Sequence, residues 1–459
     1  MIKQAVLKLG GVLPLFARQA AILVFSLVFS IVLARYGTFH QFATFSNAVI
    51  AMNLLNIMID PSIYGIAMKY EYNSIQFKSI FLMHITVSVL LTVLLFFGAL
   101  FISKALFVDV LVVYSIALSI LMLPWQAAMQ FKSEKTGSFW GNILTETGQI
   151  AVFYLISIFS IIYLDDADQS YALSFAFILR SCLGLAAAYH ISGEIPKPVC
   201  FVINRESYFN SLTIFVVNII GFSNSLAAPL IIGANLSQKS VAVVNWSVSN
   251  AQYVQQPILI LNRYLFPKLS KGTNDNFSKV YLCLIGLYVG ILGVFALFSK
   301  EFIGIVFGIK WLPYANILLL LLLTTVLVPL SVPTGVIANI SGKSKIIFSM
   351  SVIRIGLFWA SLIIFVKLDL GIISFVFAQA VAELLHIITF FLVNKQTALK
   401  ILQRYALIIL CTSWIIILPL YLYSQAESNI KIILIKLLAA AIYVFLVSGM
   451  SISSLRRSI

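Results

Sequence analysis

Residues 80–101 read IFLMHITVSVLLTVLLFFGALF, a stretch of 22 residues without a charged side chain. A hydrocarbon layer about 30 Å thick takes about 20 residues of α-helix, so this stretch is long enough to cross a membrane. Similar apolar runs, separated by short polar turns, follow one another along almost the whole chain. The pattern predicts an all-α integral membrane protein with about 14 transmembrane helices.

Each predicted span has the length of one membrane crossing. We place the spans at residues 13–34, 43–67, 80–101, 109–130, 139–164, 171–191, 210–234, 240–262, 280–299, 313–338, 346–366, 370–393, 405–424 and 432–450. Charged residues make up only 10% of the chain, against about a quarter in soluble domains, which excludes a soluble globular protein. The first run is longer than the core of a signal peptide and leads straight into further spans, so we expect it to be retained.

Lysine and arginine are distributed unequally between the two sets of alternate turns. One set carries 19 of the 30 basic residues, whereas the other carries seven and includes the acidic turn at residues 165–168. Basic residues gather on the cytoplasmic side of membrane proteins, so we expect both chain ends in the cytoplasm. The net charge of +15 then reflects topology, and we expect no binding of nucleic acid.

Short segments recur in the same order at a spacing of about 200 residues. The segment SFAF at residues 174–177 matches SFVF at residues 374–377, and Pro124 corresponds to Pro333. Such repeats predict two pseudo-symmetric six-helix bundles in parallel orientation, a recurrent design of transporters. The predicted parts are an N-terminal bundle at 1–200, a C-terminal bundle at 201–395 and two additional helices at 396–459.

Polar side chains follow one face of the predicted eighth span. These are Asn245, Ser249, Gln252 and Gln256, at helical spacing, with Arg263 just beyond. The first, second and seventh spans add further polar residues, namely Arg18, Asn53, Asn56, Asp60, Asn218 and Asn224. Amides in a membrane need partners, so these faces either join helices by hydrogen bonds or line a hydrated cavity. We favour a substrate cavity, with snorkelling of Arg18 as the alternative at that position.

Four ionisable residues lie well inside predicted spans, where charge is expensive and is usually paired or functional. Glu146 and Arg180 lie at similar depth on neighbouring spans, and so do Arg354 and Glu383, so we expect each couple to pair. His386 lies one turn from Glu383 and adds a second titratable group there. Two interpretations stay open: structural ion pairs, or groups that couple transport to an ion.

Motifs for nucleotide, metal or covalent chemistry are missing from the sequence. We find no phosphate-binding Gly-Lys-Ser/Thr loop, no nucleophile elbow and no His, Cys and Asp residues at metal-binding spacing. The four cysteines also lack metal or redox spacing. We therefore expect no cofactor, no metal and no enzymatic activity, and transport driven by an ion gradient, the membrane potential or removal of the product.

Several segments resemble the polysaccharide flippases. They are LARYG at 33–37, FATFS at 42–46, IDPSIYG at 59–65, FIGIVFG at 302–308 and ANISGKSK at 338–345. Through most of its length the chain is similar to the O-antigen-type flippases of the multidrug/oligosaccharidyl-lipid/polysaccharide exporter superfamily. It departs from them at Asp60, which is followed by proline and serine where such proteins usually carry leucine and glycine.

The resemblance implies a V-shaped bundle in the bacterial inner membrane that moves undecaprenyl-pyrophosphate-linked oligosaccharide to the periplasmic leaflet. Amides would bind sugar hydroxyls and cations would bind pyrophosphate. The implied partners are the lipid-linked oligosaccharide, membrane lipids, a polysaccharide polymerase and a chain-length regulator. The alternatives are a cation-coupled multidrug antiporter of the same superfamily and a lipid II flippase. A polymerase or ligase would need a large periplasmic loop, and a membrane scaffold would leave the polar face unexplained.

Overall fold

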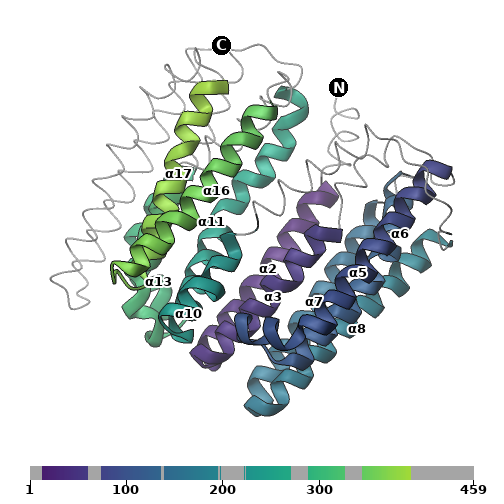
Figure 1. The fold of residues 1–459 in the computed structure, drawn as a ribbon, viewed down its shortest axis with the longest axis horizontal. Coiled ribbons are helices and arrows are strands. Elements are labelled where there is room, and N and C mark those ends of the chain that lie inside the picture. The colour runs from purple at the N-terminus through teal and green to yellow at the C-terminus, as the bar shows by residue number, and fades with distance from the viewer. Residues whose placement is uncertain are drawn as a thin grey trace. The chain divides into compact units, whose positions relative to one another are not determined.

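The structure is a computed structural model of the 459-residue chain. It describes residues 13–59, 74–135, 139–194, 224–269, 288–325 and 344–393, together with residues 197 and 222. Every regular element within these ranges is a helix (Figure 1), which confirms the predicted all-α class. The number of 14 spans stays a prediction, because the last two predicted spans lie outside the described residues and four others lie partly outside them.

The described helices follow the predicted spans closely. In chain order the first are α2 (Leu13–Tyr36), α3 (Phe39–Ile59), α5 (Ile75–Leu106), α6 (Val110–Lys135), α7 (Phe139–Tyr163) and α8 (Asp166–Ser192). After these come η1 (Asn224–Leu226), η2 (Ala228–Ile232), α10 (Gly233–Asn235), α11 (Gln238–Leu269), α13 (Ser299–Val306), η3 (Ile309–Tyr314), α14 (Ala315–Thr324), α16 (Ser344–Lys367) and α17 (Ile373–Val393). Among the residues that the structure describes, six helices are long and apolar enough to cross a membrane, or seven if one bent pair is a single span.

Local signals explain where α5 begins and ends. The Ser74 side chain accepts a hydrogen bond from the Phe77 backbone N–H, which satisfies one of the free donors of the first turn. At the other end Phe107 adopts the left-handed conformation, with φ of 53°, and its N–H bonds back to the carbonyl of Ser103. This conformation is uncommon outside glycine, so contacts around the turn must hold it in place.

The chain divides into two compact units, Met1–Asn245 and Trp246–Ile459, with the boundary inside α11. In the first unit α6 packs against α5 and α8, while α7 packs against α8 and α2. α3 packs mainly on α6 and α5. The predicted division at residues 1–200, 201–395 and 396–459 stays a prediction.

In the second unit α16 and α17 form a tightly packed hairpin, and α14 packs against α17. The helix at Tyr288–Leu297 and α13 are bent from each other by 72°. Aromatic rings fix the segment that follows the bend: Trp246 lies 5.5 Å from Phe307 and 4.8 Å from Trp311, measured between ring centroids.

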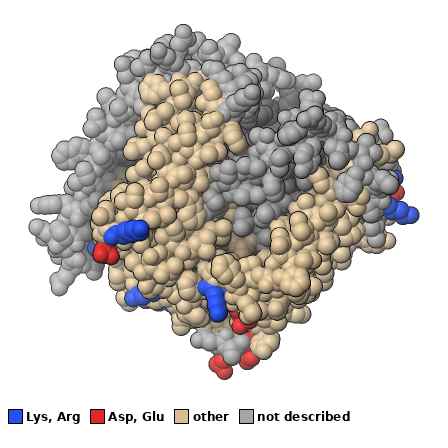
Figure 2. Space-filling view, viewed as in Figure 1, with Lys and Arg blue, Asp and Glu red and all other residues tan. Residues whose placement is uncertain are grey.

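The outer faces of the spans are apolar. On α5 the side chains of Leu90, Leu94, Phe97 and Phe101 are exposed, with Phe97 exposed by 89%. Figure 2 shows the described part of one face as almost entirely uncharged, with charged side chains confined to its margins. Large apolar residues in contact with solvent would be unfavourable in a soluble protein, so these faces contact lipid. The chain is a multi-pass membrane protein.

Candidate functional site

An ion pair lies between α2 and α7 in the first unit. Arg18 Nη2 contacts Glu146 Oε2, and the two side chains are 31% and 20% exposed. Two to three turns further along the same two helices, the Phe29 and Tyr154 rings stack with centroids 4.9 Å apart. The pair corrects one expectation, since the sequence predicted Arg180 as the partner of Glu146, whereas the cavity-lining role of Arg18 stays a prediction.

Arg180 of α8 occupies a different position. Its guanidinium carbon lies 5.8 Å from the centroid of the Phe153 ring, within the range of a cation–π interaction. Glu146 forms its ion pair with Arg18 on α2, and the described contact of Arg180 is with the Phe153 ring.

A glutamine pair links α6 and α7 next to this ion pair in sequence. Gln126 Nε2 donates a 3.1 Å hydrogen bond to Gln149 Oε1, and both side chains are buried. Gly184 of α8 leaves the room that the Gln149 amide occupies, because a Cβ at residue 184 would stand 2.4 Å from its Cδ and Nε2. Small residues at helix contacts in membranes allow such close approach. α8 thus contributes to the glutamine pair by lacking a side chain at residue 184, which leaves space for the Gln149 amide.

A second charged cluster lies in the second unit, between α16 and α17. Arg354 Nη1 lies 3.4 Å from Glu383 Oε1, and Gln379 Nε2 donates a 2.7 Å hydrogen bond to the same oxygen. Glu383 is buried. This is the contact that the equal depth of Arg354 and Glu383 predicts. The side chain of His386 lies outside the described residues.

The first residue of the predicted polar face has a structural partner. Asn245 Nδ2 donates two hydrogen bonds of 2.8 Å, to Ser46 Oγ and to Asn47 Oδ1 on α3. We call these three residues the Asn245 cluster. Asn47 Nδ2 in turn donates a 2.6 Å hydrogen bond to the Leu106 carbonyl at the end of α5. Asn245 is 4% exposed, so in this structure it links helices by hydrogen bonds.

The other predicted cavity residues are placed only in part. Asn53 and Gln252 are exposed, and Asn224 and Ser249 are partly buried. The side chains of Asn56, Gln256 and Arg263 lie outside the described residues, as do Asp60 and Asn218 altogether. Along the polar face of α11 the side chains are therefore buried at Asn245 and exposed at Gln252. The assignment of Gln252 and the residues beyond it to a cavity stays a prediction.

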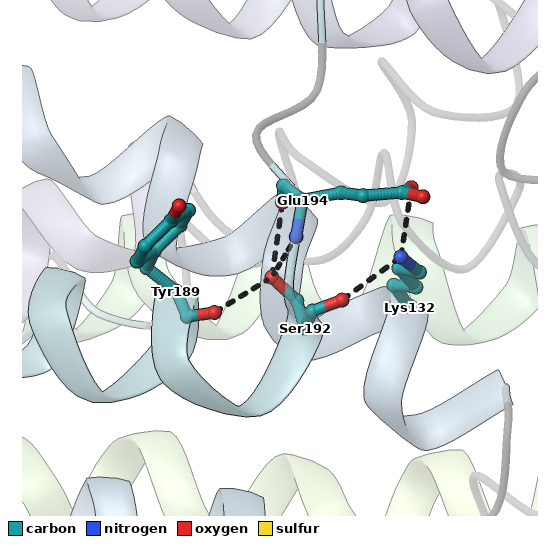
Figure 3. A network of polar contacts seen from close by, with 4 residues as sticks. All are labelled: Lys132, Tyr189, Ser192 and Glu194. Atoms are coloured by element: carbon teal, nitrogen blue, oxygen red, sulfur yellow. Dashed lines mark hydrogen bonds and ion pairs between the residues drawn. The ribbon is translucent and has the colours of Figure 1, made fainter.

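A lysine of α6 caps the C-terminal end of α8. Lys132 Nζ donates a 2.9 Å hydrogen bond to the Ser192 carbonyl and lies 2.8 Å from Glu194 Oε2 (Figure 3). The Ser192 hydroxyl lies between the Tyr189 and Glu194 carbonyls in the same turn. A cation at a helix C-terminus is favourable because the last carbonyls carry partial negative charge. The contact fixes the loop after α8 to α6.

Three positions at the glutamine pair, namely Gln149, Gln126 and Gly184, were missed in the sequence. Gln149 lies three residues after Glu146 on one helix face, which was a usable signal. Gln126 and Gly184 carried none, because single amides and glycines are common in apolar helices. Among the described residues, no group of three or more His, Cys, Asp or Glu side chains could hold a metal ion.

Comparison with known proteins identifies the family. A sequence profile described as "Polysaccharide biosynthesis protein" matches residues 32–316, more than half of the chain. The chain belongs to this family. The family match confirms the resemblance to proteins of polysaccharide biosynthesis that the sequence showed. A comparison with curated protein sequences finds no match.

Solved structures of transporters share the fold. One described as "Lipid II flippase MurJ, inward closed conformation" is 14% identical, with a TM-score of 0.63, and the match covers 97% of this chain and 99% of that one. An inward-facing MATE family multidrug resistance transporter of the MOP superfamily is 12% identical, with a TM-score of 0.62 over 82% and 94% of the two chains. The MATE multidrug transporter DinF-BH is 14% identical, with a TM-score of 0.55 over 84% and 94%.

Proposed function

We propose that this protein is a flippase that moves undecaprenyl-pyrophosphate-linked oligosaccharide, the precursor of O-antigen or a similar surface polysaccharide, across the bacterial inner membrane. Both chain ends would lie in the cytoplasm, and transport would proceed by alternating access towards the periplasm. The observation that carries the proposal is the family match over residues 32–316, since proteins of polysaccharide biosynthesis need such a step when the glycan is built on a lipid.

The extent of the structural matches supports a flippase over a drug antiporter. The flippase MurJ matches nearly the whole of this chain, whereas the two MATE transporters match 82% and 84% of it. Antiporters of that kind typically have twelve spans, two fewer than we predict here. A cation-coupled multidrug antiporter is therefore the weaker candidate, and a lipid II flippase is the closer one.

The intramembrane charges also suit an anionic headgroup. Two arginines and one glutamate, namely Arg18, Arg180 and Glu146, lie in one region of the first unit, so positive charge exceeds negative charge there. Guanidinium groups bind phosphate with paired hydrogen bonds, and amides bind sugar hydroxyls. We propose that Gln252 and the deeper residues of α11 contact the glycan, and that Arg354 and Glu383 are either structural or coupled to an ion.

Transport by the purified protein tests the function directly. Proteoliposomes loaded with fluorescent undecaprenyl-pyrophosphate oligosaccharide should show protein-dependent movement of the headgroup between leaflets, read by a membrane-impermeant quencher. Lipid II and a cationic rhodamine dye serve as competing substrates in the same assay. Faster movement of lipid II would favour the lipid II flippase, and export of the dye without oligosaccharide movement would make the protein a drug antiporter.

A second test concerns the proposed cavity. Gln252→Leu should preserve abundance in the membrane and reduce export of surface polysaccharide, because leucine cannot bind sugar hydroxyls. A matched control is Leu94→Ala, which alters an exposed, lipid-facing position on α5 and should leave export unchanged. Equal export by both variants would remove Gln252 from the site. Co-purification would test whether a polymerase and a chain-length regulator are partners.

A further inference from the structure

The segment FIGIVFG at residues 302–308 lies where the chain turns sharply after a predicted span. The helix at Tyr288–Leu297, within the predicted ninth span, and α13 are bent from each other by 72°. Spans tilt from the membrane normal by about 20° on average, so α13 runs closer to the membrane surface than to the normal. The eight residues of α13 extend about 12 Å, too short to cross a hydrocarbon layer about 30 Å thick.

The charges of α13 and η3 place them at an edge of the membrane. Lys300, Glu301 and Lys310 lie within eleven residues of one another, between the predicted ninth and tenth spans. Charged side chains are costly in the middle of a membrane, whereas lysines at its edge reach the lipid phosphates. The ninth span runs outward according to the distribution of basic residues, so this edge is predicted to be periplasmic.

One side of α13 and η3 is packed on protein. Ser299, Ile303, Phe307 and Trp311 recur every four residues, and each is at most 1% exposed. The ring centroids of Phe307 and Trp311 lie 5.5 Å and 4.8 Å from that of Trp246 on α11. These contacts lie within the second unit, and they fix which side of α13 and η3 faces outward.

Apolar side chains occupy the positions midway between the buried ones. Ile305 and Ile309 are 71% and 80% exposed, and Pro313 is exposed as well. Among the large apolar residues that the structure describes, only Phe97 on the lipid-facing side of α5 is more exposed than Ile309. Helices at a membrane interface place apolar side chains at the boundary of headgroups and acyl chains, with lysines beside them.

A glycine joins α13 to η3 without turning this apolar face away. Gly308 adopts a φ of 99°, which few other residues tolerate, and its N–H donates a 3.0 Å hydrogen bond to the Ile303 carbonyl. The chain can therefore leave α13 while Phe307 stays buried and Ile309 stays exposed.

We propose that α13 and η3 form an interfacial anchor that binds the headgroup region of the periplasmic leaflet. Ile305 and Ile309 lie between the lipid chains, and Lys300 and Lys310 bind lipid phosphates. The partner is a lipid surface, because the exposed apolar side chains and the lysines match its two layers and the segment directly follows a span. Through Trp246 the anchor sets the depth of α11 in the membrane.

A second turn on the same predicted side has a similar composition. Leu368 and Leu370, between α16 and α17, are 63% and 39% exposed and follow Lys367. This turn also places apolar side chains beside a lysine at the end of a span, as expected for residues that contact the membrane interface.

The depth of spin labels in the membrane tests the anchor. In a variant whose four native cysteines are replaced by alanine, Ile305→Cys and, separately, Ile309→Cys carry a nitroxide in vesicles of phosphatidylethanolamine and phosphatidylglycerol. The ratio of accessibility to molecular oxygen over accessibility to a water-soluble nickel chelate rises with depth. Both labels should give ratios between those of Leu90→Cys, exposed in the middle of the predicted third span, and Glu194→Cys, exposed in a polar loop.

Two outcomes of this measurement would overturn the proposal. Ratios equal to that of Glu194→Cys would place Ile305 and Ile309 in water, where they would form a docking site for another protein. Ratios equal to that of Leu90→Cys would place α13 in the interior of the membrane. All four labelled positions are exposed, so the labels do not disturb the packing of the core.

Lipid preference tests the role of the lysines. Lipids with a nitroxide on the headgroup quench a fluorophore at Ile305→Cys, and an anionic lipid should quench more strongly than a zwitterionic one. Lys310→Gln should reduce this preference by up to about fivefold. The control Lys104→Gln alters an exposed lysine in the last turn of α5 and should leave the preference unchanged. An unchanged preference in Lys310→Gln would overturn the binding of phosphates by this lysine.

The anchor can be tested separately from the proposed function. Both measurements use vesicles without oligosaccharide, so they succeed or fail whatever the protein transports. Oligosaccharide movement together with labels in water would retain the flippase and reject the anchor.

Discussion

Gly184→Ala should destabilise the first unit, because the new methyl group would overlap the Gln149 amide. The Cβ would stand 2.4 Å from Gln149 Cδ and Nε2, whereas ordinary contacts begin at 3.4 Å, so the amide must retreat by about 1 Å. Overpacking of this kind costs about 1–3 kcal/mol, and loss of the hydrogen bond from Gln126 adds about 1 kcal/mol. We expect the free energy of unfolding to fall by about 2–4 kcal/mol.

Denaturant titration in detergent micelles measures this loss, and two variants isolate its cause. Gly148→Ala on α7 places a methyl group where nothing lies within 4 Å, so it should not lower the free energy of unfolding. Gln149→Ser removes the clash. In that background, Gly184→Ala should lower the free energy of unfolding by less than about 0.5 kcal/mol. An equal loss in both backgrounds would refute the overlap with Gln149 as the cause.

Three further predictions concern charge, packing and topology. Glu146→Gln strands Arg18 and should lower the free energy of unfolding by about 1–3 kcal/mol, less than for a fully buried pair because both groups are partly exposed. Exchanging the two residues should recover much of the loss in a denaturant titration. Phe77→Ala should cost about 3–5 kcal/mol, since Phe77 is buried, whereas Phe97→Ala on the lipid face should cost less than about 0.5 kcal/mol. A cysteine replacing Asp168 should react with a membrane-impermeant reagent added to intact cells, because its turn is predicted to be periplasmic.

Each of these predictions has a control. Glu194→Gln breaks an ion pair whose glutamate is 59% exposed, and it should cost less than about 0.5 kcal/mol. If Glu194→Gln lowers the free energy of unfolding as much as Glu146→Gln does, burial of the ion pair does not determine its contribution to stability. Similar losses for both phenylalanine variants would contradict the assignment of the α5 face to lipid. Labelling of residue 168 only after the cells are opened would invert the proposed topology.

The sequence predicted the helices well, because membrane crossing depends on length and polarity, which are local properties. The described bounds of α7 and α16 differ from the predicted spans by at most two residues at either end. The pairing of Arg354 with Glu383 was also predictable, since neighbouring helices of a hairpin bring residues of equal depth together. The same reasoning failed for Glu146 and Arg180, which lie on the hairpin formed by α7 and α8.

Rotation about the helix axis explains the difference. Depth along a span is readable from the sequence, but the direction of a side chain around the axis depends on which helices surround the span. Glu146 meets α2, whose contact with α7 joins segments more than a hundred residues apart. The polar face of α11 met the same limit, because its periodicity cannot tell a neighbouring helix, which Asn245 meets, from the exposed surface at Gln252. The error at Glu146 concerns the partner of a polar residue and leaves its depth in the membrane unchanged.

The chemistry of the Asn245 cluster has an electrical consequence. Its amide and hydroxyl groups carry no net charge and do not titrate in the physiological range. Moving one elementary charge through the membrane field exchanges about 2.3 kcal/mol per 100 mV, whereas parting neutral dipoles exchanges almost none of that work. Breaking the hydrogen bonds among these three side chains would thus be electrically silent. A voltage dependence of transport would have to originate in charged groups elsewhere, such as Arg354 and Glu383, or in the substrate itself.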